Sequence, residues 1–213
     1  QLQKILFKNL GITNYSDTLK KMQEFTVQRT NHTSDQIWFL EHEPVYTYGI
    51  KTSKDDIPEN TQLPLLKSDR GGKITFHGPG QLVCYPILDL DNFFTDINKY
   101  LRLLEEVVIL TLKSYGIKGE RSKGETGVWI DVGSLKARKI CAIGVKTSRW
   151  VTLHGFAFNI STDLSYFNDI VPCGIVGKNV TSLERELNSS IDKEKIKKEI
   201  VGHLINLFEM EII

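Results

Sequence analysis

Cys173 is the residue whose surroundings most suggest covalent chemistry. It lies in "VPCGIVGK", between a proline and a glycine, and this setting predicts a sharp turn that presents the sulfur with open backbone around it. A thiolate in such a place is a nucleophile. The alternative is that Cys173 is a small buried side chain, because free cysteine is among the most buried residue types. The local sequence leaves both interpretations open.

Lys139 is the second candidate, because it lies in "RKICAIGV", an otherwise apolar and strand-like segment. If this strand alternates, Lys139, Cys141 and Ile143 share one face. A lysine on a buried face is unfavourable as a cation and tends to release its proton, which suits a general base. Two alternatives stay open. Lys139 extends its amine to water from the start of the strand, or Cys141 is the nucleophile instead of Cys173.

A glycine-rich segment, "RGGKITFHGPGQ" at residues 70–81, is the third candidate. Its glycines place backbone groups where side chains would obstruct a ligand. It is therefore either a loop whose N–H groups and His77 face a ligand, or a pair of tight turns around a strand. His154 also precedes a glycine, so we expect both histidines to line one cleft. No histidine or cysteine spacing indicates a metal site, and we expect neither metal nor cofactor.

The composition excludes several classes of protein. The chain has 213 residues, of which 40% are hydrophobic and 25% charged, as in ordinary globular proteins. A net charge of +1 provides no basic excess for nucleic acid, and no run of about 18 apolar residues predicts a membrane span. The three cysteines match no disulfide framework, so we expect free thiols and a cytoplasmic location. An organelle is the alternative for a chain whose presequence has been removed.

Strand-like and helix-like segments are interspersed, which predicts one α/β (α+β) domain over residues 1–213. Its central sheet is expected to be mixed, with flanking helices. Strands are predicted in "KILFKNLG", in the two parts of "QIWFLEHEPVYTYG" around Pro44, and in "GVWIDV", "RKICAIGVK" and "WVTLHGFAFNI". Helices are predicted at residues 15–26, 95–115 and 192–209.

Two local features of the C-terminal part are more specific. The last predicted helix carries one apolar stripe, formed by Ile196, Ile200, Leu204 and Phe208. "TSLE" predicts a capping box in which Thr181 caps a helix and Glu184 reaches back to it.

Five stretches resemble the lipoyl(octanoyl) transferase family, the octanoyl-[acyl-carrier-protein]:protein N-octanoyltransferases. They are "LEHEPVYTYG", "DRGGKITFHGPGQLVCYPILDL", "RKICAIGV", "LHGFAFNISTDLSYF" and "VPCGIVGKNVTSL", and they cover most of residues 38–183 in the family's order. The resemblance implies the biotin/lipoate protein ligase-like fold. It also implies transfer of an octanoyl group from octanoyl-acyl carrier protein to a lysine, the first step of protein lipoylation. The implied acceptors are lipoyl domains of 2-oxoacid dehydrogenase complexes and the glycine-cleavage H protein.

The resemblance also implies roles for individual residues. Cys173, in "PCG", matches the nucleophile that carries the acyl group as a thioester, and Lys139 matches its catalytic partner. The resemblance therefore favours Cys173 over Cys141 as the nucleophile. The family's substrate-contacting segments match Arg70, Gly71, Gly72, Lys73, Ile74, Thr75, Phe76 and His77, then Ala142, Ile143 and Gly144, then Gly155, Phe156 and Ala157. Among them we expect Ile74, Phe76 and Ile143 to line the acyl chain's tunnel, with His154 in a supporting role.

Two other functions have to be separated from acyl transfer. An ATP-dependent lipoate or octanoate protein ligase of the same fold activates a free acid and lacks a catalytic cysteine. A non-catalytic acyl-binding protein forms no covalent species.

A basic stretch is a candidate docking surface for acidic protein partners. Residues 134–150 contain no acidic residue, and their cationic side chains are Lys136, Arg138, Lys139, Lys146 and Arg149. Such a patch would steer the partners electrostatically. The alternative is that each of these side chains is simply solvated.

Overall fold

The computed structural model describes residues 2–170 and 179–213, so Cys173 lies outside the described residues. The helices are α1 (Tyr15–Gln28), α2 (Ile97–Ser114), α3 (Leu183–Leu187) and α4 (Lys193–Phe208), with short 3-10 turns η1 (Lys54–Asp56), η2 (Leu90–Asn92) and η3 (Leu164–Asp169). The strands are β1 (Gln3–Thr13), β2 (Asp35–His42), β3 (Val45–Tyr48), β4 (Leu65–Lys67), β5 (Ile74–His77), β6 (Gln81–Ile87), β7 (Glu120–Ser122), β8 (Glu125–Ile130), β9 (Arg138–Ser148), β10 (Val151–Asn159), β11 (Asn179–Val180) and β12 (Met210–Ile212).

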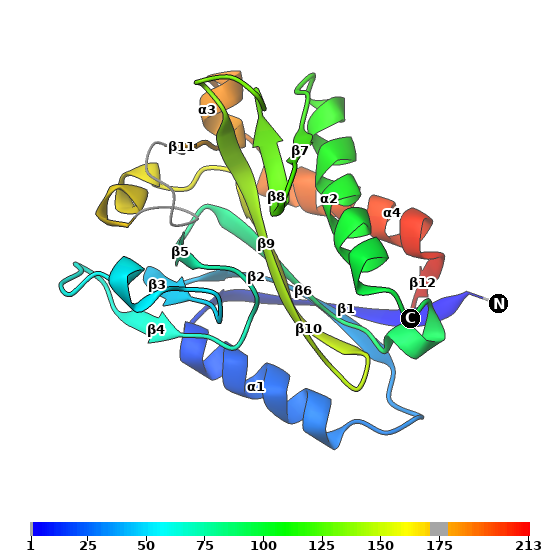
Figure 1. Cartoon of the computed structure of the whole chain (residues 1–213). Coiled ribbons are helices and arrows are strands. Elements are labelled where there is room, and N and C mark those ends of the chain that lie inside the picture. Colours follow the sequence, from blue (N-terminus) through cyan, green and yellow to red (C-terminus); the bar gives the residue numbers. More distant parts are fainter. Residues whose placement is uncertain (1, 171–178) are drawn as a thin grey trace.

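Two sheets organise the described part of the chain (Figure 1). The larger has nine strands in the order β12-β1-β2-β6-β10-β9-β8-β7, with β11 beside β9. β12, β1 and β2 run parallel, whereas β2, β6, β10, β9 and β8 pair antiparallel, so the sheet is mixed. The smaller sheet has the order β4-β3-β5. This arrangement confirms the predicted mixed sheet with flanking helices.

Pro44 separates the two sheets at the predicted break. Proline lacks the N–H that a ladder needs, and β2 ends just before it. The chain resumes after Pro44 as β3, which pairs with β4 and β5 instead of the large sheet. The strands after Pro44 therefore form a second sheet, separate from the large one.

The two faces of the large sheet pack against different elements. Helices α2 and α4 cover one face, where they form the largest apolar cluster with inward strand residues such as Cys84, Phe156 and Phe158. The predicted stripe of α4 is buried there, as expected. Helix α1 packs on the opposite face through Met22, against Val83 and other strand residues. No helix in the described ranges combines the length and apolar character that crossing a bilayer requires.

A β-bulge changes the expected alternation of β9. Val128 of β8 pairs with Cys141, and the next residue, Trp129, pairs with Lys139, so Ile140 is the extra residue. Ile140 and Cys141 are consequently both buried in the cluster under α2 and α4. The prediction that Lys139 and Cys141 share a face was therefore wrong, because it assumed uninterrupted alternation.

The helix cap near residue 181 is displaced by one residue from its predicted position. Ser182, not Thr181, caps α3, and its hydroxyl accepts a hydrogen bond from the N–H of Arg185 at 3.2 Å. The Thr181 hydroxyl instead donates to the carboxylate of Glu186 at 2.6 Å. Thr181 is still part of a strand-to-helix connection, and its N–H donates to the carbonyl of Lys139 at 2.9 Å.

Candidate functional site

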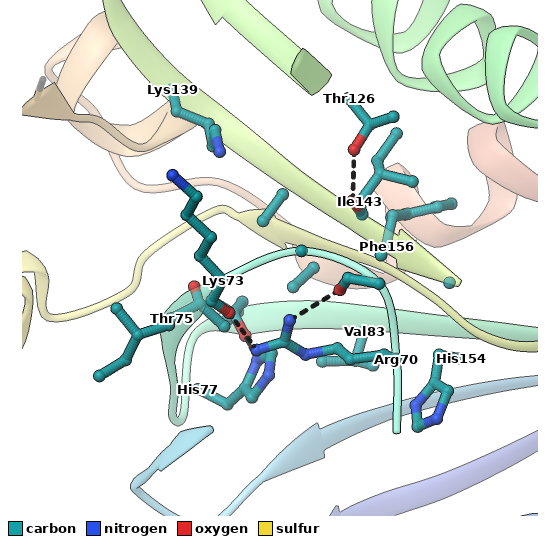
Figure 2. A pocket seen from close by; sticks show the side chains of 18 of the residues that line it. Arg70, Lys73, Thr75, His77, Val83, Thr126, Lys139, Ile143, His154 and Phe156 are labelled. Atoms are coloured by element: carbon teal, nitrogen blue, oxygen red, sulfur yellow. Dashed lines mark hydrogen bonds between the residues drawn. The ribbon is translucent and has the colours of Figure 1, made fainter. Parts of the chain in front are cut away.

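A cavity of about 330 Å³ lies between the large sheet and the segment that follows β4. That volume is in the range of small-molecule sites. Its floor comes from β6, β9 and β10, its roof from residues 70–73, and one side from β5 of the small sheet. Figure 2 shows these side chains converging on one space.

Arg70 holds the roof in place. Its guanidinium donates to the carbonyls of Gly71 at 2.9 Å, Lys73 at 2.9 Å and Thr47 at 3.1 Å, and to the Thr47 hydroxyl at 2.8 Å. The residue is only 8% exposed, so these bonds are shielded from water. The N–H of Gly71 donates to the carbonyl of Val145 on β9 at 2.9 Å, which ties the roof to the floor. The arginine is therefore a structural clamp.

Small side chains keep the floor clear. Ala142 on β9 pairs with Ala157 on β10, and Gly144 pairs with Gly155. A Cβ atom on Gly144 would lie 2.6 Å from the carbonyl oxygen of Gly71, so any side chain there would displace the roof. These four small residues form a strip along the floor, and at Gly144 the roof lies directly against this strip.

Lys139 lies at one end of this strip. Its Nζ is 4.8 Å from the ring centroid of Trp129, within the range of a cation–π contact. Gly127, with a φ of +132°, lies beside the Lys139 side chain, and a Cβ atom there would meet the Cys141 carbonyl oxygen at 2.7 Å. The N–H of Gly127 donates at 3.0 Å to Glu105, a fully buried carboxylate on α2. Figure 2 shows the Lys73 side chain directed toward Lys139 across the cavity.

A chain of hydrogen bonds connects the small sheet to the backbone of Lys139. His77 Nδ1 lies 2.7 Å from Gln81 Oε1, and the Gln81 amide donates to Asn159 Oδ1 at 3.0 Å. The Asn159 amide donates to the carbonyl of Thr181 at 3.1 Å, and Thr181 in turn contacts Lys139. Since Gln81 Oε1 can only accept, His77 carries its hydrogen on Nδ1. The chain fixes the position of Lys139 relative to the floor.

The opposite end of the cavity is a cluster of aromatic and polar side chains. The Tyr85 hydroxyl lies 2.6 Å from His42 Nε2, and the Tyr15 hydroxyl lies 2.8 Å from that of Ser68. His154 Nε2 lies 2.7 Å from Asp69 Oδ1, and Lys146 donates to the other oxygen of Asp69 at 3.0 Å. These polar groups are bonded to one another, so they do not need a ligand to satisfy them.

The histidines around the cavity are neutral near pH 7. Burial lowers the pKa of His42 to about 4, and it lowers the pKa of His77 well below its usual value. Burial also lowers the pKa of His154, against the opposing effect of Asp69. The pKa of Asp69 is well below its usual range, chiefly because of its hydrogen bond to His154. Neutral His154 therefore donates its Nε2 hydrogen to an ionised carboxylate.

The structure brings together most of the residues that the sequence singled out. Lys139 and His154 line the cavity, and so do the predicted substrate-binding residues other than Phe76, namely Arg70, Gly71, Gly72, Lys73, Ile74, Thr75, His77, Ala142, Ile143, Gly144, Gly155, Phe156 and Ala157. Phe76 differs from the expectation, since its ring points the other way and stacks on Tyr166 at 4.8 Å between centroids. It alternates with Thr75 and His77 along β5, which places it in the core of the small sheet.

Of the cysteines that the structure describes, neither is placed to be a nucleophile. Cys84 and Cys141 are fully buried. Burial raises the pKa of both thiols well above the usual value, so neither forms a thiolate readily. This removes Cys141 as the rival of Cys173 on physical grounds.

Several residues that line the cavity were not predicted from the sequence. The most informative are Tyr15, Gln81, Val83, Tyr85 and Asn159. Gln81, Val83 and Tyr85 alternate along β6, directly after the glycine-rich segment, so the period of two was a usable signal. Tyr15 looked like one more apolar position of a helix, and only the fold shows that it reaches the cavity.

The predicted basic docking stretch is partly neutralised by internal partners. Arg138 forms ion pairs with Glu186 at 2.6 Å and Asp131 at 2.7 Å, and Lys146 pairs with Asp69. Lys136 and Arg149 are exposed. The stretch is therefore not a continuous basic surface.

Known structures share this fold at low sequence identity. A bipartite lipoate protein ligase from Thermoplasma acidophilum superimposes with a TM-score of 0.79 over 99% of this chain and 86% of its own, at 13% identity. A lipoate-protein ligase A bound with ATP gives 0.73 over 100% and 90%, at 14% identity. A biotin protein ligase from Aquifex aeolicus gives 0.55 over 98% and 70%, at 10% identity. The expected biotin/lipoate protein ligase-like fold is confirmed.

Curated relatives are much closer in sequence. An octanoyltransferase of Flavobacterium johnsoniae is 48% identical over 99% of both chains, and one of Christiangramia forsetii is 49% identical over 96% of both. The family model of the lipoyl protein ligase A/B catalytic domain matches residues 14–205. The chain therefore belongs to the lipoyl protein ligase A/B catalytic-domain family and, within it, to the octanoyltransferases.

Proposed function

We propose that the chain transfers an octanoyl group from octanoyl-acyl carrier protein to a lysine of a lipoyl domain, through a thioester on Cys173. The acceptors are lipoyl domains of 2-oxoacid dehydrogenase complexes and the glycine-cleavage H protein. The observation that carries the proposal is the cavity with Lys139 at one end and the small side chains of Ala142 and Ala157 on the floor beyond it. Octanoyl transfer itself agrees with the octanoyltransferases that are 48–49% identical to the chain.

Acylation of the enzyme is the first step. The Cys173 thiolate attacks the carbonyl carbon of the donor thioester, and the bond from that carbon to the carrier's sulfur breaks. An ammonium at Lys139 stabilises the thiolate beforehand and then gives a proton to the departing carrier thiolate. One thioester replaces another, so the step needs no ATP.

Transfer to the acceptor is the second step. The neutral amine of the acceptor lysine attacks the acyl-Cys173 carbonyl, an amide bond forms, and the carbon–sulfur bond breaks. The attacking nitrogen loses one proton, which Lys139 accepts as general base. Cys173 returns as a thiolate and Lys139 as an ammonium, so the cycle closes.

The position of Lys139 suits both steps. The carbonyl of Lys139 accepts from Thr181, and β11, which begins at Asn179, pairs with the start of β9. Phe167 and Val180, which precede and follow residues 171–178 in the sequence, both line the cavity.

An ATP-dependent ligase is the second candidate, because ligases of this fold are among the known structures. Those structures are 10–14% identical to the chain, against 48–49% for the octanoyltransferases. The sequence similarity therefore supports transfer over ligation.

We further propose that residues 1–213 act as one catalytic domain in a bacterial cytoplasm. Residues from Tyr15 to Val180 contribute to the one cavity described above. Relatives come from bacteria, and the described cysteines are unpaired, as is typical of a reducing compartment.

An acyl-transfer assay separates the candidates. The purified chain is incubated with a lipoyl domain and either octanoyl-acyl carrier protein or octanoate with ATP, and the acceptor's intact mass is measured. Octanoylation with the carrier protein alone is expected. Octanoylation with octanoate and ATP alone would show a ligase, and a bound but untransferred acyl group would show a binding protein.

A further inference from the structure

We propose that Tyr85, together with His154, is the end wall that sets the length of acyl chain accepted by the cavity. The inference rests on the proposed function, because it assumes that the acyl group starts beside Lys139. It assigns a specificity-determining role to two side chains that lie at the far end of the floor.

The strands give the direction of the acyl chain. Gln81 is joined through Asn159 to the Lys139 end, so it marks the start of the floor on β6. Val83 follows on the same face and pairs with Ala157. Tyr85 is the next residue on that face and also lines the cavity. The side chains of β6 therefore lead from the reacting end to the tyrosine ring.

For an acyl carbonyl that lies level with Gln81, the length of the floor corresponds to eight carbons. Tyr85 is four positions beyond Gln81 along β6, which corresponds to about 13 Å between their Cα atoms. An extended eight-carbon acyl chain has seven carbon–carbon bonds of about 1.5 Å and spans about 9 Å in its zigzag. The difference of about 4 Å is the contact distance between a methyl group and a ring. Two further carbons would overlap the ring.

The wall is fixed in position by its own hydrogen bonds. The Tyr85 hydroxyl is bonded to His42 at 2.6 Å, and His154 is bonded to Asp69 at 2.7 Å. The rings of Tyr85 and His154 meet at 87° with centroids 6.1 Å apart, so they form a corner. Because the Tyr85 hydroxyl and His154 Nε2 already have hydrogen-bond partners, the rings can contact the apolar end of an acyl chain.

The corner is also backed by protein. Tyr85 belongs to the apolar cluster that includes Met22 of α1 and Trp38 of β2. The N–H of His154 contacts Met22 Sδ at 3.3 Å, so α1 supports both rings. A longer acyl chain cannot push the rings away without moving this helix.

Competition between donors of different length tests the wall. Carrier proteins charged with 6-, 8-, 10- and 12-carbon acyl groups are mixed with a lipoyl domain, and the acylated products are resolved by intact mass. Tyr85→Leu is expected to raise the ratio of 10-carbon to 8-carbon product about tenfold, as two methylenes find new space. Tyr85→Phe loses the hydrogen bond to His42 but keeps the ring and its packing against Met22 and Trp38, so it should keep the wild-type ratio of products.

Two further variants provide a matched control and an independent test of the wall. Tyr100→Leu removes a fully buried tyrosine from the α2 side of the sheet, so it loses a similar side chain without changing the cavity's length. Ala157→Val narrows the strip before the wall, and it should shift the preference toward the 6-carbon chain even if Tyr85→Leu fails to fold.

Each outcome separates the wall from the proposed function. If folded Tyr85→Leu still transferred acyl groups with the wild-type ratio of 10-carbon to 8-carbon product, the proposed wall would be wrong and the proposed function would stand. An unchanged chain-length preference in Ala157→Val would have the same meaning. A shift of the ratio in Tyr100→Leu equal to that in Tyr85→Leu would also overturn the wall. Absence of transfer by the wild type at every length would overturn the proposed function and the wall with it.

Discussion

The two faces of the large sheet use the same strands for opposite purposes. On the face under α2 and α4, β6 and β10 present Cys84 and Phe158, which are fully buried in the largest apolar cluster. On the other face the alternate residues of the same strands include Val83 and Ala157, which leave a cavity. Close packing of large apolar side chains stabilises the face under α2 and α4. The cavity face carries small side chains and hydrogen-bonded polar groups, which leave room for a ligand.

The polar groups are distributed just as unequally. The cavity face buries His42, His77, His154 and Arg70, all of which have hydrogen-bond partners. On the α2 side, Glu105 is a fully buried carboxylate, and it accepts a hydrogen bond from the N–H of Gly127. We therefore infer that stability depends mainly on one face of the sheet and acyl transfer on the other, and mutations can test this.

Replacing the cavity lysine should have the largest effect. Lys139→Ala is expected to lower the transfer rate by about 10²–10⁴, because a general acid–base group is lost. The free energy of unfolding should change little, since Lys139 is only partly buried. Transfer rates and denaturant unfolding measure the two quantities on the same samples.

Cys141→Ala is the matched control for the lysine variant. The thiol lies on the opposite side of β9, in the apolar cluster, so this variant should keep near-wild-type transfer. If Lys139→Ala retained full activity, or if Cys141→Ala alone abolished it, the assignment of chemistry to the cavity face would be wrong.

A core phenylalanine should show the reverse pattern. Phe158→Ala removes a fully buried ring from the α2 side and is expected to lower the free energy of unfolding by about 3–5 kcal/mol. The KM for the acyl donor should stay near the wild-type value in the molecules that remain folded. Val83→Ala, on the cavity face, should cost less stability and change KM more. If Phe158→Ala and Val83→Ala changed KM equally, the distinction between a stabilising face and a binding face would be wrong.

Lowering the pH should reduce the free energy of unfolding through His42, a buried residue of the cavity face. A folded-state pKa of about 4 for His42 lies below its unfolded value of about 6.5, so the unfolded chain binds more protons between these limits. The contribution of His42 is therefore fully present above pH 6.5 and is lost as the pH falls toward 4. Between pH 7 and pH 5 it amounts to about 2 kcal/mol, which denaturant unfolding can measure. Asp69, whose pKa is lowered, loses its contribution only below its ordinary value of 3.8.

His42→Gln isolates this histidine. Its free energy of unfolding should fall less steeply than that of the wild type between pH 7 and pH 5, because one titrating group is missing. Identical slopes for the two proteins would show that His42 is not held neutral in the folded state.

Local patterns predicted those parts of the fold that depend on local physics. The stripe Ile196, Ile200, Leu204 and Phe208 is buried as expected, because the period of a helix determines which residues share a face. The break at Pro44 followed from its missing N–H. Most of the cavity residues also came from the sequence, although through resemblance to a family rather than through spacing.

The missed features depend on contacts between distant segments. The bulge at Ile140 is a mismatch between β8 and β9, so β9 alone carries no sign of it. The small sheet joins β3, β4 and β5, and its parallel pair β3–β4 leaves no hairpin signal. Tyr85 reaches His42 across 43 positions of sequence. Such partners become visible only when the fold has placed them together.

Intact-mass measurement of the acyl-enzyme tests the central claim most directly. The wild type, Cys173→Ala and Cys141→Ala are each incubated with octanoyl-acyl carrier protein in the absence of an acceptor. The proposed mechanism predicts one octanoyl adduct on the wild type and on Cys141→Ala, and none on Cys173→Ala. An adduct that persists in Cys173→Ala, or a wild type that transfers octanoyl groups without ever carrying one, would contradict it.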